Sequence, residues 1–239
     1  MKTITIVMPV YNEEKFVQSA IQTVLASDTL GLKKEIIIVD DCSTDKTKAK
    51  IREEIQKNKK DLITLVEKKK NEGKSSAVKI GLIKSKGDIV LVQDADLEYN
   101  PEDYPVLLSP FIKQDADVVY GSRFISNRPH RVLYFWHAVM NTFLTTLSNM
   151  LTNLNLTDME TGYKVFRGSL IRSIATRLES KRFGFEPEVT ARIAKVKGIK
   201  IYEVGISYQG RTYEEGKKIN WIDGVLALWE IIKYNLITK

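Results

Sequence analysis

The stretch "DIVLVQDADLEYNPED" (88–103) decides the fold, because a run of four apolar residues is followed by two aspartates, Asp94 and Asp96. A strand this apolar is buried on both faces, as in a parallel sheet covered by helices. Removing a carboxylate from water is costly unless it meets a cation or another partner. The stretch therefore predicts a buried strand that delivers two carboxylates to a site at its carboxyl end.

The same pattern recurs through the first half of the chain, where apolar runs of strand length alternate with stretches of helical periodicity. The runs are 3–10, 35–40, 62–67, 88–94 and 116–122, and the helical stretches are 13–26, 45–57 and 74–85. Continuous apolar runs, in contrast to alternating ones, are typical of a parallel sheet. We therefore predict an α/β fold that is Rossmann-like, with a mostly parallel central sheet and helices on both faces.

The second half has a different character. Residues 132–157 contain no Asp, Glu, Lys or Arg, and their apolar residues recur at helical spacing, which predicts a helix over 132–155. Residues 187–197 predict a further helix, 199–208 a strand, and 221–237 a last amphipathic helix. No clear linker separates the halves, so we predict a single domain over 1–239 with amphipathic C-terminal helices.

The chain has 239 residues and a formal net charge of +7, from 37 Lys and Arg against 30 Asp and Glu. This balance suits nucleic acid, a membrane surface or a phosphorylated substrate and does not choose between them. Nucleic-acid binding requires aromatic residues interleaved with Lys and Arg on one face. Here the aromatic residues lie on apolar helices and acids line the strand ends, so no nucleic-acid partner is expected.

Targeting features point to the cytoplasm. The only cysteine, Cys42, fits a reducing compartment. The N-terminus is too short and too strand-like for a signal peptide. No segment has the roughly 20 consecutive apolar residues of a spanning helix.

Polar residues follow every predicted strand of the first half. They are Tyr11 and Glu13 after the first strand, in a segment that begins with Pro9; Asp40 and Asp41 after the second; Asn71 and Lys74 after the third; Asp94 and Asp96 after the fourth; and Arg123 after the fifth. In open α/β sheets ligands bind beyond the carboxyl ends of the strands. Five strand ends that supply polar groups to one edge predict a binding site there.

The site lacks a glycine-rich phosphate loop. No G-x-G-x-x-G follows the first strand, and no G-x-x-x-x-G-K-[ST] occurs anywhere, which argues against a dinucleotide oxidoreductase or a P-loop enzyme. The Asp-x-Asp pair offers another way to hold phosphate. Hard oxygen ligands favour Mg²⁺ or Mn²⁺, which bind through one or two carboxylates together with substrate phosphates. We therefore predict that Asp94 and Asp96 hold a metal ion against a diphosphate.

Eight segments, in order along the chain, carry a family resemblance. They are "VMPVYNEE" (7–14), "IIIVDDCSTDKT" (36–47), "NEGKSSAVKIGL" (71–82), "KGDIVLVQDADLEYNPED" (86–103), "DVVYGSRF" (117–124), "TDMETGYKVFR" (157–167), "RFGFEPEVTARI" (182–193) and "YEVGISYQGRTYEEGKK" (202–218). The set resembles family 2 glycosyltransferases of the GT-A fold, most closely the polyprenyl-phosphate glycosyltransferase branch that includes dolichyl-phosphate mannose synthase. The resemblance implies a nucleotide-sugar donor, a divalent metal ion and an inverting transfer.

The resemblance also implies roles for individual residues. Residues 1–123 would form the nucleotide-sugar half and 124–239 the acceptor-facing and membrane-facing half. The donor-binding residues would be Pro9, Tyr11, Glu13, Asp40, Asp41, Asn71, Lys74, Gln93, Asp94 and Lys217, with Gln93 orienting the sugar. The catalytic residues would be Asp96, Arg123, Asp158 and Arg211, with Arg123 meeting an acceptor phosphate and Arg211, with Lys217 and Lys218, closing over the diphosphate.

Two acceptor classes fit these residues. A polyprenyl phosphate, of the dolichyl or undecaprenyl type, is already an anion and needs only cations, for which Arg123, Arg128 and Arg131 are placed. A hydroxyl of a saccharide or glycolipid, as in polysaccharide synthesis, needs a general base. Asp158 is then the candidate, with Glu186 and Glu188 behind it, although a helix-terminal cap is the alternative role for Asp158. We favour transfer of a hexose from a GDP- or UDP-sugar to the lipid phosphate.

The charge-free helix has two interpretations. It packs in the core or against a second copy in a homodimer, or it lies in a membrane interface with its aromatic face in lipid. Tyr134, Phe135 and Trp136 at its start suit the headgroup boundary. The arginines before it would then meet anionic headgroups. On this basis we expect a peripheral protein on the cytoplasmic face of the membrane.

Overall fold

The computed structural model describes residues 1–58, 62–125, 130–132, 134–212, 214 and 221–238. Its strands are β1 (Thr3–Val10), β2 (Lys33–Asp40), β3 (Ile63–Glu67), β4 (Ile89–Val92), β5 (Val118–Ser122), β6 (Lys164–Arg167) and β7 (Ile201–Gly205). Its helices are α1 (Val17–Ala26), α2 (Thr47–Lys57), α3 (Lys74–Lys84), α4 (Tyr104–Lys113), α5 (Phe135–Thr152), α6 (Gly168–Ala175), α7 (Phe185–Ala194) and α8 (Trp221–Ile232). A short 3₁₀ helix, η1 (Pro101–Asp103), precedes α4, and a π-helical turn, η2 (Lys233–Ile237), follows α8.

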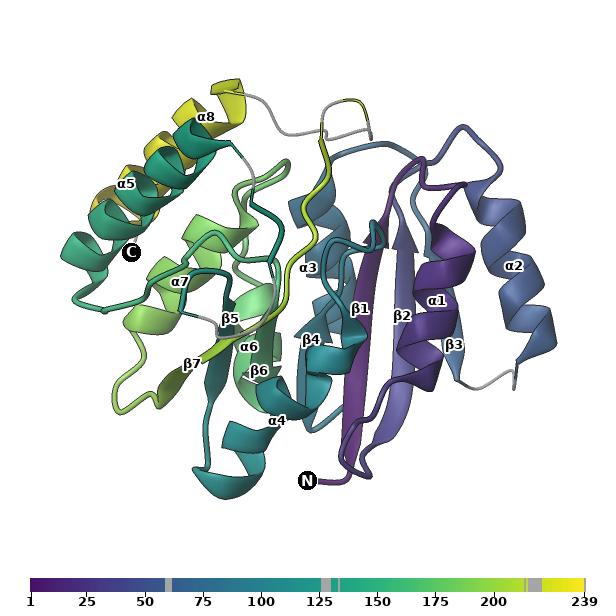
Figure 1. Ribbon diagram of the computed structural model, residues 1–239. Helices are drawn as coiled ribbons and strands as arrows, with labels where there is room; N and C mark the ends of the chain where they lie inside the picture. Colours follow the sequence, from purple (N-terminus) through teal and green to yellow (C-terminus); the bar gives the residue numbers. More distant parts are fainter. Residues whose placement is uncertain (59–61, 126–129, 133, 213, 215–220, 239) are drawn as a thin grey trace.

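The strands form one seven-stranded sheet in the order β3-β2-β1-β4-β6-β5-β7 (Figure 1). All neighbouring pairs are parallel except those of β6, which is antiparallel to both β4 and β5. The apolar runs of β1, β2 and β4 are buried along most of their length, as a sheet covered on both faces requires. The predicted mostly parallel α/β fold is therefore confirmed.

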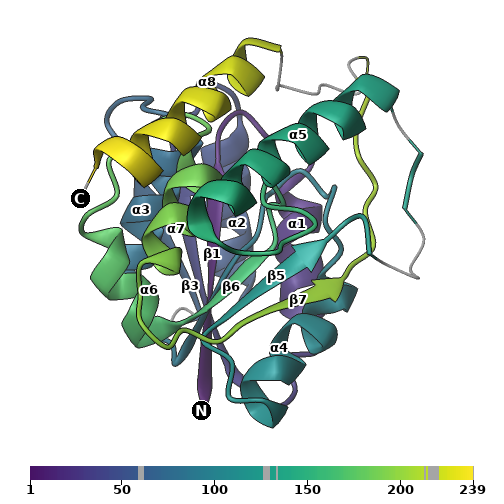
Figure 2. The same cartoon turned by 90° about the vertical axis from the view of Figure 1, so that its left-hand side faces the viewer.

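Helices cover both faces of the sheet. Apolar residues of α1, α2 and α4 pack on one face, and those of α3, α6 and α7 pack on the other. Helices α5 and α8 lie side by side as an outer layer over α7 (Figure 2). The C-terminal helices therefore extend the second face and do not form a separate core.

Three elements are absent from the sequence prediction. The sequence does not predict helix α4, strand β6 or helix α6. The predicted helix over 187–197 is observed as α7, Phe185–Ala194. Strand β6 is only four residues long, and its two apolar residues lie between the fully buried Lys164 and Arg167, which is too short a pattern to predict a strand. Helix α6 follows β6 without a loop, so no turn residues mark the boundary between them.

Helix α5 turns its larger apolar side chains outward. Its buried residues are only Leu144, Thr145 and Ser148. Its exposed apolar residues are Phe135, Trp136, Val139, Met140, Phe143 and Met150, of which Trp136 and Met150 are each 75% exposed. Leu144, Leu147 and Leu151 pack against the core on the other side of the helix, so the expected packing on the core holds for one side only. Within the part of the chain that the structure describes, no helix has the length and apolarity needed to cross a membrane.

Candidate active site

The sheet topology explains why distant segments meet at one edge. The parallel strands all end at the same edge, so the segments that follow β1, β2, β4 and β5 gather there (Figure 1). Because β6 runs the opposite way, the segment that precedes it, residues 157–163, reaches this edge too. Asp158 thus meets Arg123, although 35 positions separate them in sequence.

The two aspartates after β2 have different environments. The carboxylate of Asp41 accepts hydrogen bonds from Lys68 Nζ at 2.5 Å and from the backbone N–H groups of Glu72 and Gly73 at 3.1 and 2.6 Å. Asp40 accepts one bond, from the Ser43 N–H at 3.1 Å, and its Oδ1 is buried without a hydrogen-bond partner among the described residues. A buried acceptor of this kind is costly unless a ligand satisfies it. Asp40 Oδ1 therefore has an acceptor position to offer to a ligand, whereas the described residues occupy both oxygens of Asp41.

The segment after β1 forms the rim beside Asp40. The N–H of Asn12 donates to Ser43 Oγ at 3.0 Å, and the N–H of Glu13 donates to Thr47 Oγ1 at 2.9 Å. These bonds join the segments after β1 and β2 into one wall of the site. Tyr11 is 37% exposed at this rim, and Pro9 lies within β1 opposite Val39.

Asn71 lies in the segment before α3, and Lys74 is the first residue of that helix. Asn71 is exposed, whereas Lys74 points into the site. Lys74 Nζ lies 2.9 Å from Asp94 Oδ2 and 3.2 Å from Glu186 Oε1. Burial alone would lower the pKa of Lys74, but its ion pairs with Asp94 and Glu186 raise it well above its ordinary value. Lys74 therefore remains a cation that holds Asp94 in place.

Asp96 is held from the other side by Arg211. Arg211 Nη2 lies 3.2 Å from Asp96 Oδ2, and its other nitrogens lie 3.7 Å from Glu13 and 3.6 Å from Glu98. Burial, followed by the charges of Asp94 and Glu98, raises the pKa of Asp96 to about 7. One arginine thus balances three carboxylates, and this part of the site carries excess negative charge.

This charge and donor set fit a hard divalent cation. Asp94 and Asp96 offer carboxylate oxygens, the ligands that Mg²⁺ and Mn²⁺ prefer. Among the residues described by the structure, no group of three or more His, Cys, Asp or Glu side chains surrounds a common point. The arrangement suits a metal ion that takes one or two protein carboxylates and completes its coordination with substrate phosphates.

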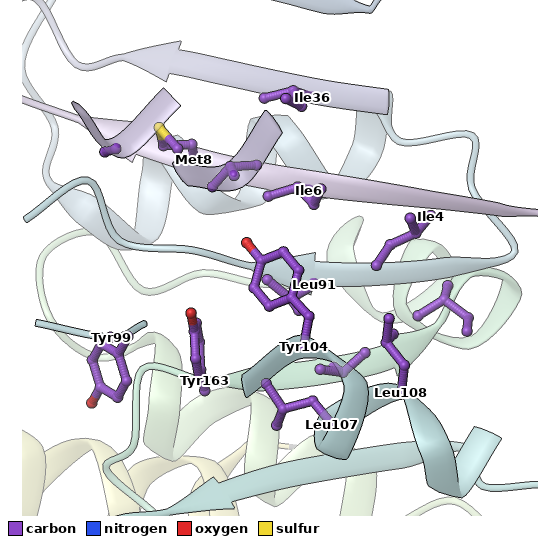
Figure 3. Packing of buried hydrophobic residues seen from close by; sticks show 14 of the residues in the cluster. Ile4, Ile6, Met8, Ile36, Leu91, Tyr99, Tyr104, Leu107, Leu108 and Tyr163 are labelled. Atoms are coloured by element: carbon purple, nitrogen blue, oxygen red, sulfur yellow. The ribbon is translucent and has the colours of Figure 1, made fainter. Parts of the chain in front are cut away.

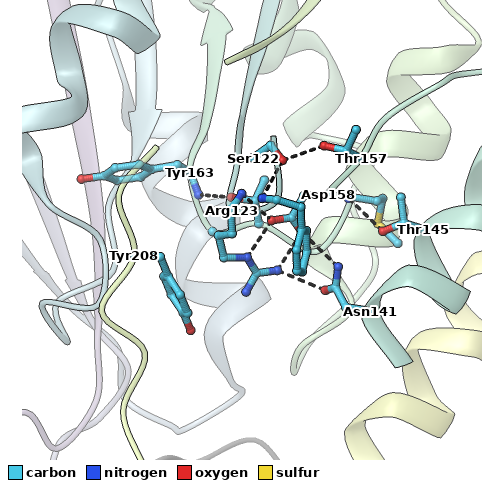
Figure 4. Close-up of polar contacts among 12 residues, drawn as sticks. Ser122, Arg123, Asn141, Thr145, Thr157, Asp158, Tyr163 and Tyr208 are labelled. Carbon is cyan, nitrogen blue, oxygen red and sulfur yellow. Dashed lines mark hydrogen bonds and ion pairs between the residues drawn. The ribbon is translucent and has the colours of Figure 1, made fainter. Parts of the chain in front are cut away.

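Arg123 and Asp158 form a buried bidentate pair (Figure 4). Arg123 Nε lies 2.6 Å from Asp158 Oδ2, and Arg123 Nη2 lies 2.7 Å from Asp158 Oδ1. Asp158 is fully buried; burial alone would raise its pKa, but Arg123 lowers it below the ordinary value. Asn141 of α5 touches both partners, at 3.1 Å from Arg123 Nη2 and 3.2 Å from Asp158 Oδ1. Sequence reasoning identified Arg123 and Asp158 but not Asn141.

Tyr208 connects the two sides of the site. The guanidinium of Arg123 lies over the Tyr208 ring, 5.2 Å from its centre. The Tyr208 hydroxyl donates to Glu98 at 2.8 Å, and Glu98 also accepts from the Arg211 N–H at 2.8 Å. A continuous chain of contacts therefore runs from Arg123 to Arg211 and Asp96. Neither Tyr208 nor Glu98 was singled out from the sequence, although both lie within segments that carry the family resemblance.

A second group of buried charges lies between Lys74 and Asp158. Burial, then the charge of Glu186, raises the pKa of Glu160 to about 7. Burial lowers the pKa of Lys164 to about 8, and its Nζ donates to the Thr161 carbonyl. Glu160 and Lys164 belong to the segment "TDMETGYKVFR", but their position in the buried group depends on the unexpected strand β6.

The expected contact of Gln93 with the sugar is wrong. Gln93 is only 2% exposed, and its Oε1 accepts from the hydroxyls of Tyr104 at 2.8 Å and Tyr163 at 2.7 Å. Figure 3 shows both tyrosines among the packed apolar residues of the sheet face that α4 covers. Gln93 therefore satisfies two buried hydroxyls and fixes the start of the Asp94–Asp96 segment.

Some expected residues lie outside the described part of the chain. These are Arg128, Lys217 and Lys218. Arg131 is described and exposed; its N–H donates to the Tyr208 carbonyl at 2.9 Å, and its side chain donates to the Gly210 carbonyl at 3.2 Å.

Comparison with known proteins decides the family. The model of glycosyl transferase family 2 matches residues 5–174, which is more than half of the chain. The chain belongs to glycosyl transferase family 2. Dodecaprenyl-phosphate galacturonate synthase from Rhizobium johnstonii is 26% identical over 216 residues, covering 90% of this chain and 61% of that protein. Undecaprenyl-phosphate 4-deoxy-4-formamido-L-arabinose transferase from Edwardsiella ictaluri is 27% identical over 236 residues, covering 98% of this chain and 67% of that protein. This family 2 chain thus spans about two thirds of the length of these relatives.

A solved structure supports the fold. Glucosyl-3-phosphoglycerate synthase from Mycobacterium tuberculosis, in complex with Mn²⁺, uridine diphosphate and phosphoglyceric acid, matches with a TM-score of 0.73 and 19% identity. The match covers 100% of this chain and 80% of that one. The predicted GT-A fold, the glycosyltransferase class and the resemblance to polyprenyl-phosphate sugar transferases are confirmed.

Proposed function

We propose that this family 2 glycosyltransferase moves a hexose from a GDP- or UDP-sugar to a polyprenyl phosphate, with inversion and with Mg²⁺ or Mn²⁺ bound. One observation carries the proposal, a chain of contacts across the site. Arg123, which Asp158 holds, lies over the ring of Tyr208. Tyr208 is linked through Glu98 to Arg211, which pairs with Asp96. In this proposal Arg123 is the cation for the acceptor phosphate, and the nearby carboxylates hold the metal ion and the diphosphate. The polyprenyl-phosphate relatives and the Mn²⁺ complex support both halves of the proposal.

On the donor side, Asp40 accepts from the base and Asp94 and Asp96 hold the metal ion. The metal, when bound, neutralises the charge that develops on the leaving diphosphate. Lys74 keeps Asp94 oriented, and Arg211 keeps Asp96 oriented. Arg211, beside Asp96 and Glu98, is the cation placed to stabilise the charge of the leaving diphosphate.

On the acceptor side, Arg123 binds the phosphate. A phosphate oxygen attacks the anomeric carbon, and the new C–O bond forms as the bond to the diphosphate breaks, which inverts the configuration. Asp158 makes a poor general base, because it is fully buried, engaged with Arg123 and has a lowered pKa. This geometry favours the phosphate acceptor over the hydroxyl acceptor, which stays the alternative.

The membrane side of the proposal rests on the outward apolar face of α5. Phe124 and Ile125, which directly follow Arg123, are also apolar and are 48% and 49% exposed. Helix α8 beside α5 adds exposed Val225, Leu226 and Trp229. A phosphate at Arg123 would leave its prenyl chain next to this surface. We propose a peripheral enzyme on the cytoplasmic face of the membrane; a second copy covering α5 is the competing explanation.

A nucleotide-release assay tests the proposal. Purified protein is mixed with UDP-glucose, UDP-N-acetylglucosamine or GDP-mannose, with Mg²⁺ or Mn²⁺, and with or without a short polyprenyl phosphate. Release that requires both the metal and the lipid phosphate is the expected result and identifies the donor. Donor binding without lipid-stimulated release would favour a hydroxyl acceptor. The Asp96→Ala variant should lose turnover and keep its fold, and near-normal turnover in it would refute the metal role.

A further inference from the structure

Three polar side chains on the inner face of α5 hold the segment that carries Asp158. Asn141 donates to Asp158, Thr145 Oγ1 accepts from the Met159 N–H at 3.1 Å, and Asn149 bonds both the N–H and the carbonyl of Leu156. These residues are spaced four apart and therefore share one face of the helix. The outer face of the same helix carries the exposed aromatic residues. Helix α5 thus connects an apolar surface to the acceptor side of the site.

Asn141 alone among these three contacts both Arg123 and Asp158. Its Oδ1 accepts from Arg123 Nη2 at 3.1 Å and its Nδ2 donates to Asp158 Oδ1 at 3.2 Å. One amide therefore bridges the cation and the anion, which a carboxylate at this position does not reproduce because it can only accept. Asp158 and Asn141 together accept from Nε and Nη2 of Arg123 (Figure 4). The third guanidinium nitrogen, Nη1, has no hydrogen bond to any described residue.

We infer that Asn141 is a positioning residue, which sets the orientation of Arg123 so that Nη1 faces the acceptor phosphate. The inference rests on the proposed function, because it requires a phosphate at Arg123. Without the amide, the guanidinium keeps its bonds to Asp158 but loses the contact that ties it to α5. Rotation about the long arginine side chain then becomes easier, and the phosphate must restrict that freedom when it binds.

The test compares two asparagines of the same helix. Asn141→Ala and Asn149→Ala each remove an amide that holds the segment 156–158, but only the first touches Arg123. We expect Asn141→Ala to raise KM for a short, water-soluble prenyl phosphate by about 10-fold to 100-fold, the range for one hydrogen bond to a charged group. KM for the nucleotide sugar should change by less than about twofold, because the donor residues are untouched. In Asn149→Ala both constants should stay near the wild-type values.

The Asn141→Asp variant removes the donor to Asp158 in a different way, and the Tm of each variant reports whether it folds. It has the same shape and still accepts from Arg123, but it cannot donate to Asp158 and adds a second anion beside the guanidinium. We expect its acceptor KM to rise at least as much as in Asn141→Ala, again without a change in donor KM. Equal acceptor KM values in Asn141→Ala and Asn149→Ala, or a parallel rise in both constants, would overturn the inference. A wild-type protein without phosphate-dependent turnover would instead overturn the proposed function, and the inference with it.

Discussion

Replacing Asp158 by asparagine should destabilise this protein more than any exchange of a surface charge. Asp158 is fully buried and accepts two side-chain bonds from Arg123, one bond from the Arg123 N–H at 3.1 Å and one from Asn141. Removing one partner of a buried ion pair leaves the other charge uncompensated, which costs about 3–5 kcal/mol. For a chain of this size, 1 kcal/mol corresponds to about 2–4 °C in Tm. The expected loss is therefore about 6–20 °C.

Thermal unfolding of Asp158→Asn beside Asp115→Asn measures this effect. Asp115 also has two cationic partners, Arg167 at 2.7 Å and Lys200 at 2.9 Å, but it is 68% exposed. Because exposed ion pairs contribute little, Asp115→Asn should change Tm by about 2 °C or less. If the Tm of Asp158→Asn lies within about 2 °C of the wild-type Tm, the argument that burial makes the ion pair with Arg123 strongly stabilising is refuted.

The pH dependence gives an independent check of the same pair. The pKa of Asp158 is lowered in the folded state, so its contribution to stability is present above the ordinary value of 3.8 and is lost as pH falls through the folded value. The difference in stability between wild type and Asp158→Asn should therefore be constant near neutral pH and shrink below about pH 4. A difference that grew towards acidic pH would contradict the ion pair.

Four further variants test other parts of the structure. Because burial and the charge of Glu186 raise the pKa of Glu160 to about 7, its ionisation destabilises the fold as pH rises from 4.5 through 7. Glu160→Gln should thus be more stable than wild type at pH 8 and equal to it at pH 4 in urea unfolding; equal stability at both pH values would count against the buried carboxyl. Arg211→Ala leaves Asp96 and Glu98 without their cation, so its Tm should fall in the absence of metal and recover in part with Mn²⁺ and a nucleoside diphosphate. No recovery in differential scanning calorimetry would show that these carboxylates do not meet a metal. Trp136→Ser and Phe143→Ser should each weaken binding to anionic vesicles about tenfold with little change in Tm, because both side chains are more than half exposed. If vesicle binding stays unchanged and the substitutions instead dissociate a dimer in solution, the α5 face contacts a second copy of the chain.

The strand ends of the first half were predictable from the sequence because their pattern is local. The runs that became β1, β2 and β4 are continuous and apolar, and polar residues follow each of them at once. Parallel strands then bring those residues to one edge without further information. Asp40, Asp94, Asp96 and Arg123 were placed in the site on this basis.

The remaining features depend on partners that are distant in the sequence. Gln93 and Asp94 are adjacent, so they point to opposite sides of the chain, but only the positions of Tyr104 and Tyr163 decide which side is the core. Helix α5 has apolar residues on two sides, and the polar stripe faces inward because it bonds the segment Leu156–Met159. The periodicity of the sequence indicates that the helix is amphipathic, not which face meets the protein.

Strand β6 has a consequence for how this chain is synthesised. Strands β1 to β4 emerge from the ribosome in sequence, but the second neighbour of β4 begins only at Lys164, 72 positions after Val92. At about 5–20 residues per second, the β4 edge keeps its N–H and C=O groups unpaired for roughly 4–14 s. An open strand edge is a template for pairing with other chains. A chain that ends before Lys164 therefore keeps an exposed strand edge with unpaired backbone N–H and C=O groups. We expect such a truncated chain to aggregate.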